Sequence, residues 1–71
     1  MKKKRISYKP LFDLLSIRGL RLNSLRDTFS PTILYRLVHN ENVNTGTLVR
    51  LCERLGCNLN DIVEVVVDYD Q

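Results

Sequence analysis

The sequence contains no alanine and no tryptophan, and among its 71 residues there are only three glycines, two prolines and two cysteines. Two cysteines make no disulfide framework, and three isolated glycines form no phosphate-binding loop. No apolar run is long enough to cross a bilayer, and the opening MKKKR lacks the apolar segment of a signal peptide. We therefore expect a cytoplasmic protein that neither spans nor binds a membrane.

Leucine and valine dominate what is present, with twelve and seven residues in a chain whose hydrophobic fraction is 44%. Together with 27% charged residues, this composition is typical of one small globular domain. A domain of this size has little room for an active-site cleft, and no Ser/His/Asp or Cys/His arrangement offers a catalytic set. Cys52, Cys57 and the single histidine do not make up a metal ligand set. We expect no enzyme, no metal and no cofactor.

Charge is divided unevenly along the chain. Residues 1–36 carry nine Lys or Arg and two acids, whereas residues 37–71 carry two Lys or Arg and six acids. The two halves therefore have net charges of +7 and −4, which add to the overall +3. A basic half attracts a polyanion such as nucleic acid, although ordinary solubility charge gives the same count.

Apolar periodicity and capping residues predict five short helices. Ser30 and Pro31 form a strong helix start, with serine as N-cap and proline at the first helical position. Thr45 is expected to cap the fourth helix, and Gly56 to end it. The expected helices cover residues 9–18, a short segment centred on Leu25, residues 31–38, the segment from the Thr45 cap to about Leu55, and a segment from Asn58 to near Glu64.

The two ends of the chain have a different character. Residues 1–5 form a basic arm that we expect to be flexible, and residues 6–8 alternate apolar and polar like a short strand. The acidic tail, residues 67–71, continues a two-residue alternation of valines and acids that predicts extended backbone. It could pair with residues 6–8, pair with its copy in a second chain, or stay loose; an exposed apolar edge favours partnering.

Two segments, ISYKPLFDLL at residues 6–15 and NENVNTGTLVRLCERLGCNLNDIVEV at residues 40–65, resemble the small phage-repressor-like (Cro/cI, XRE) helix-turn-helix regulators of bacteria, their phages and mobile elements. The resemblance covers residues 6–66. It implies an all-α fold, a compact five-helix lambda-repressor-like domain with room for a short β-strand at either end. It also implies that the helix beginning at Ser30 and Pro31 reads DNA.

Candidate DNA contacts come from the residues and from the resemblance. Helix geometry turns Thr32, Tyr35 and Arg36 outward, and arginine is the best side chain for recognising guanine. The resemblance turns Pro31, Thr32, Ile33 and Arg36 toward the groove. It assigns phosphate-backbone contacts to Ser30, His39, Asn40, Asn42 and Asn44, and the flanking cations that we expect to reach DNA are Arg21, Lys3 and Lys4.

Two functions remain in competition. The first is a sequence-specific transcriptional regulator that binds double-stranded DNA, expected to be a homodimer and a repressor of a phage, mobile element or bacterial operon. The second is a protein-interaction module, an antitoxin or accessory subunit, that uses the same fold to hold a partner. Neither function calls for a small-molecule ligand.

Overall fold

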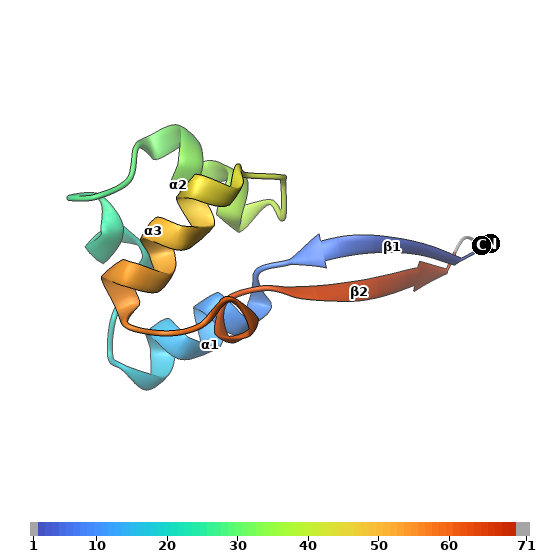
Figure 1. The fold of residues 1–71 in the computed structure, drawn as a ribbon, viewed down its shortest axis with the longest axis horizontal. Coiled ribbons are helices and arrows are strands. Elements are labelled where there is room, and N and C mark those ends of the chain that lie inside the picture. The colour runs from blue at the N-terminus through green and yellow to red at the C-terminus, as the bar shows by residue number, and fades with distance from the viewer. Residues whose placement is uncertain (1, 70–71) are drawn as a thin grey trace.

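The computed structural model describes residues 2–69 and consists of a helical head from which a two-stranded ribbon projects (Figure 1). The ribbon lies along the longest dimension of the molecule, whose extents are 40 × 24 × 19 Å. The elements in chain order are β1 (Lys2–Ser7), α1 (Lys9–Ile17), the 3₁₀ turn η1 (Leu22–Leu25), α2 (Pro31–Val38), α3 (Thr45–Leu55), the 3₁₀ turn η2 (Leu59–Asp61) and β2 (Glu64–Tyr69).

The three α-helices begin and end where local chemistry dictates. The Ser30 hydroxyl accepts a hydrogen bond from the Ile33 N–H, which confirms the predicted N-cap of α2. The predicted cap of α3 was wrong by one residue: the Asn44 side chain accepts from the Thr47 N–H at 2.7 Å, and Thr45 is already helical. Gly56 ends α3 in the left-handed conformation, with φ of 63°, as the sequence predicted.

The fold is predominantly helical with a short strand at either end, as the prediction allowed, but the described residues form three α-helices and not the predicted five. Two of the expected helices are single 3₁₀ turns, η1 and η2, and the described residues also form a two-stranded sheet. At η2 the Asp61 carboxylate accepts from the Asn58 N–H at 3.0 Å, as a helix start would. The β-branched valines that follow favour extended backbone, so the chain leaves the turn and enters β2.

The ribbon corrects the expectation of a flexible basic arm. β1 pairs with β2 in antiparallel register, with Ile6 opposite Val65 and Lys4 opposite Val67. The Arg5 Nε donates to the Asp68 carboxylate at 2.5 Å across the two strands. Of the three arrangements considered for the tail, the structure has the one in which it pairs with the N-terminal segment of its own chain. Met1, Asp70 and Gln71 lie outside the described residues.

The core lies between the three helices and is built mainly from leucine. Leu34 and Leu37 on α2 are buried, so the position of this helix about its axis is fixed. No helix in residues 2–69 is long and apolar enough to cross a membrane. The buried hydrophobic residues are Tyr8, Leu11, Leu15, Leu25, Phe29, Leu34, Leu37, Leu51, Leu55 and Ile62.

Candidate nucleic-acid interface

Helix α2 lies on the side of the head away from α1 (Figure 1). Its buried leucines, three positions apart, leave the opposite side of the helix exposed. Thr32 and Arg36, four positions apart, are both exposed, and Tyr35 beside them is 57% exposed. Arg36 makes no ion pair within residues 2–69, so its guanidinium is available to a ligand.

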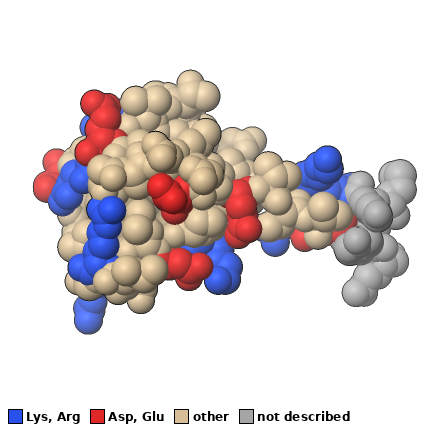
Figure 2. Space-filling view, turned by 60° about the horizontal axis from the view of Figure 1, so that its bottom comes forward, with Lys and Arg blue, Asp and Glu red and all other residues tan. Residues whose placement is uncertain are grey.

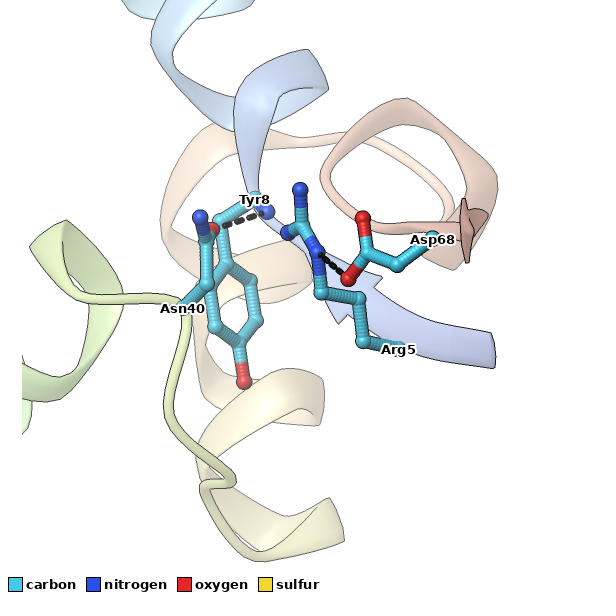
Figure 3. Close-up of polar contacts among 4 residues, drawn as sticks. All are labelled: Arg5, Tyr8, Asn40 and Asp68. Atoms are coloured by element: carbon cyan, nitrogen blue, oxygen red, sulfur yellow. Dashed lines mark hydrogen bonds and ion pairs between the residues drawn. The ribbon is translucent and has the colours of Figure 1, made fainter. Parts of the chain in front are cut away.

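Hydrogen bonds to Tyr8 hold the loop that follows α2. Asn40 has a positive φ of 54°, and its side-chain oxygen accepts from the Tyr8 N–H at 3.0 Å (Figure 3). The Tyr8 hydroxyl donates to the Glu41 carbonyl oxygen at 2.8 Å. Burial raises the pKa of the Tyr8 phenol above its ordinary value, while a backbone hydrogen bond with Val43 acts in the opposite direction. The end of α2 is therefore tied to the segment that joins β1 to α1.

Helix α3 holds the turn that leads into α2. The Arg50 guanidinium donates to the Thr28 carbonyl oxygen at 2.7 Å and lies 5.1 Å from the centre of the Phe29 ring. Arg54 approaches Asp27 at 3.7 Å. Local sequence patterns do not predict these contacts, because the partners of Arg50 and Arg54 lie more than twenty residues away along the chain. Together they fix the backbone just before the first residue of α2.

The structure places the predicted contact residues in three groups. The first group surrounds α2: Ser30, Pro31, Thr32, Tyr35, Arg36 and His39 are exposed, and Ile33 is half-buried. The ring centres of Tyr35 and His39 are 4.2 Å apart.

The second group is the loop after α2, where Asn40, Asn42 and Asn44 are exposed. The side-chain oxygens of Asn40 and Asn44 already accept internal hydrogen bonds, so only their amide NH₂ groups remain to donate. The third group is separate. Arg21 precedes η1, and Lys3 and Lys4 lie on the paired strand β1.

The charges around the molecule are arranged differently on different surfaces. Figure 2 shows the face seen from below α1, where acidic and basic side chains are interspersed. Around η1 and α2, by contrast, Arg26 and Arg36 are exposed and make no ion pair among the described residues. Arg26 also lines a shallow groove between η1 and α2 with Pro31 and Tyr35. Two arginines without an ion pair among the described residues, Arg26 and Arg36, therefore lie on the motif that the sequence assigned to DNA.

The two cysteines lie together at the end of α3 and serve the fold. The Cys57 N–H donates to the Cys52 carbonyl oxygen at 3.0 Å, which closes the helix beyond Gly56. Burial and the neighbouring Cys52 thiol raise the pKa of the Cys57 thiol. Within residues 2–69 no group of three or more His, Cys, Asp or Glu side chains could hold a metal ion.

Two comparisons with known proteins found a match, one to a family model and one to a solved structure. A family model described as the Cro/C1-type helix-turn-helix DNA-binding domain matches residues 1–68. Among solved structures, the chain is similar to the crystal structure (form II) of the transcriptional regulator VanUg, with a TM-score of 0.86 and 34% identical residues. That match covers 92% of this chain and 89% of the other. A search of curated proteins found no match.

Proposed function

The chain belongs to the family of Cro/C1-type helix-turn-helix DNA-binding domains, and from this premise we propose that it is a sequence-specific transcriptional regulator that reads the major groove with α2. The family is a non-enzymatic class of DNA-binding regulators. One observation carries the proposal: the core fixes α2 so that Thr32 and Arg36 project from one exposed side, and Arg36 has no ion pair with any residue that the structure describes. A short rigid helix with such a face matches the width of the major groove.

Base recognition is assigned to the first two turns of α2. Arg36 donates in bidentate fashion to a guanine, and the Thr32 hydroxyl or methyl meets a base edge. Pro31 and the exposed part of Ile33 offer apolar contact to thymine methyl groups. These four residues face the groove in our proposal, and Tyr35 lies beside them.

Contacts to the phosphate backbone are assigned to the residues that flank α2. Ser30, His39 and Asn42 lie at its two ends, and the free amide groups of Asn40 and Asn44 supply neutral donors. Cations farther along the surface extend the contact, and they are Arg21, Lys3 and Lys4. An occupied operator excludes other proteins from the same groove, so repression follows directly from binding. A homodimer would read a two-fold symmetric operator.

Selection of bound duplexes from a random pool tests the proposal directly, because it reports binding, preferred sequence and half-site spacing together. Binding by several cations should weaken steeply as salt rises. Arg36→Ala should lose about 1–3 kcal/mol of binding free energy and relax the preference at one base position. Lys9→Ala is the matched control, since it removes one positive charge on α1 that is paired with Asp13. An unchanged preference in the Arg36 variant would remove this residue from the reading set.

One observation favours the competing function, a protein-interaction module. The first helix of the motif is only the four-residue 3₁₀ turn η1. An antitoxin or accessory subunit does not need that helix to cross a DNA backbone. Absence of binding to any duplex at low salt, or affinity that does not change with salt, would favour the interaction module.

A further inference from the structure

The two cysteines of the chain meet where α3 ends and the backbone turns toward β2. Gly56 ends α3 with a left-handed φ of 63°, and the Cys57 N–H donates to the Cys52 carbonyl oxygen at 3.0 Å. In a helix ending with this hydrogen bond, the side chain after the glycine packs against a side chain of the last helical turn. Here these two side chains are those of Cys57 and Cys52. The local backbone therefore brings the two thiols together.

The geometry of the pair meets the requirements of a disulfide. Both cysteines are free and half-buried. A disulfide requires Cα atoms within about 7 Å of each other and side chains that face each other. The backbone hydrogen bond secures the distance, because standard bond lengths on either side of a 3.0 Å contact keep the two Cα atoms within about 7 Å. Burial is the largest cause of the raised pKa of Cys57, and a side-chain hydrogen bond with the Cys52 thiol, which also contributes, shows that the two thiols face each other.

A hollow in the surface beside α3 gives small molecules access to both thiols. Cys52 and Cys57 line this hollow, which has a volume of about 330 Å³. Its other walls are mainly apolar, and they include Val49 and Leu59, which are 57% and 51% exposed. Among the described residues that line it, Glu53 alone is charged. A small uncharged reagent therefore reaches the thiols without repulsion, whereas an anionic reagent is repelled by the Glu53 carboxylate.

From this arrangement we propose that Cys52 and Cys57 form a dithiol site that exchanges with small uncharged disulfides and closes reversibly into an intramolecular disulfide. In the first step, the thiolate of one cysteine attacks the small disulfide, which forms a mixed disulfide and releases one small thiol. The other cysteine then attacks the protein sulfur of the mixed disulfide and releases the second small thiol. The chain loses two hydrogen atoms and the small disulfide gains them, so no further oxidant is consumed. The inference does not depend on the proposed binding of DNA.

The fold should favour this disulfide beyond what the short spacing of the two residues does. Two cysteines this close in sequence also meet in an unfolded chain, whereas α3 and Gly56 hold them together in the folded one. A disulfide that fits the fold stabilises the folded chain relative to the unfolded one. By linkage, folding then favours closure of the disulfide by the same factor, which we expect to be about tenfold or more.

Redox titration of the full chain against mercaptoethanol and its disulfide tests the proposal, once in buffer and once in urea that unfolds the chain. After free thiols are alkylated, trypsin cuts behind Arg54, between the two cysteines, so residues 51–54 and 55–71 separate in the reduced chain and stay joined in the oxidised one. The equilibrium constant for closure should be about tenfold or more larger in buffer than in urea. An equal or smaller constant in buffer, or joined peptides only in a product of doubled intact mass, would overturn the proposal.

Urea unfolding of the oxidised and reduced chains closes the cycle. The oxidised chain should have a folding equilibrium constant that is larger by the same factor, with the reduced chain as its control. An oxidised chain less stable than the reduced one would show that the fold strains the disulfide, and would contradict the proposal.

Three substitutions separate the two exchange steps and the role of charge. Cys52→Ser and Cys57→Ser each keep one thiol and should stop at the mixed disulfide, seen as the addition of one mercaptoethanol unit, whereas the original chain goes on to closure. A mixed disulfide that persists equally in all three proteins would refute the second step. Glu53→Gln should speed the reaction with glutathione disulfide, which is anionic, by about twofold or more and leave the rate with the uncharged reagent unchanged. Unchanged rates with both reagents would refute the preference for an uncharged disulfide.

Discussion

Substitution of Asn40 tests whether the protein itself holds the loop after α2. This residue meets two requirements at once. Its backbone adopts a positive φ of 54°, a conformation that asparagine and glycine tolerate far better than alanine. Its side-chain oxygen accepts from the N–H of Tyr8, a residue with no exposed surface. Glycine, alanine and aspartate at this position separate the two requirements.

The expected losses of folding stability follow from these contacts. Asn40→Gly keeps the backbone conformation but leaves the Tyr8 N–H without its acceptor, at a cost of about 1–3 kcal/mol. Asn40→Ala adds the left-handed strain of roughly 1–2 kcal/mol. Asn40→Asp keeps both the acceptor and the tolerated conformation, and should stay within about 0.5 kcal/mol of the original chain. A domain of this length has a free energy of unfolding of only about 4–10 kcal/mol, so each loss is measurable.

Urea denaturation followed by circular dichroism should therefore give the aspartate variant a free energy of unfolding close to that of the original chain. The glycine variant should have a lower value, and the alanine variant the lowest. DNA affinity should follow a different order, because aspartate replaces an amide donor by a negative charge next to the proposed phosphate contact and should bind most weakly among the folded variants. A glycine variant as stable as the original chain would refute the role of the bond to Tyr8. An aspartate variant as unstable as the alanine variant would refute the idea that a side-chain oxygen at position 40, which asparagine and aspartate both provide, stabilises the fold by accepting from the Tyr8 N–H.

Three further predictions concern elements that position α2. Tyr8→Phe removes the bond to the Glu41 carbonyl and should lower the free energy of unfolding by about 0.5–1.5 kcal/mol in urea titrations at neutral pH. Burial raises the pKa of Tyr8, so the neutral phenol stabilises the fold at pH values below its ordinary pKa of 10.0, and this stabilisation is lost as pH rises through the folded pKa. The stability of the Phe variant should therefore fall less in alkaline melts than that of the original chain. Parallel curves of stability against pH for the two proteins would contradict this prediction. Gly56→Ala should cost roughly 1–2 kcal/mol in thermal melts, from the positive φ alone, because nothing lies within 4 Å of the added Cβ. Ser30→Ala should cost about 0.5–2 kcal/mol, and no change in the melting temperature would mean that the cap of α2 contributes nothing.

Helices that carry strong local signals could be predicted from the sequence. α2 has the predicted bounds because Ser30 supplies the cap and Pro31 is preorganised for the first helical position. The outward face of α2 followed from the same helical spacing, which put Leu34 and Leu37 inside. The predicted core helix after Asn44 was displaced by only one residue at its start.

The ribbon could not be predicted with the same certainty because its signal is divided between the two ends of the chain. Four consecutive basic residues repel one another and suggest a loose arm when considered alone. Pairing with the acidic, valine-rich tail brings negative charge beside these basic residues. Lys3 lies opposite Asp68, and Arg5 donates a hydrogen bond to the carboxylate of Asp68. The periodicity of apolar residues also favoured a helix at residues 58–64. Pairing with β1 instead stabilises an extended backbone from Glu64 onward. Pairing between the two ends of the chain therefore determines the extended backbone of both the N-terminal and the C-terminal segment.

The short η1 turn does not by itself argue against reading of DNA. In a helix-turn-helix, the first helix serves to hold the entry to the second in a fixed orientation. Here Leu25, on the single turn of η1, is fully buried, and α3 completes the support through Arg50 on the Thr28 carbonyl and the Phe29 ring. With the buried leucines of α2 behind it and the bonds to Tyr8 at its far end, α2 is fixed at its start, along its length and at its end. The rigidity that groove reading requires is therefore supplied by α3 and by the segment between β1 and α1, in place of a longer first helix.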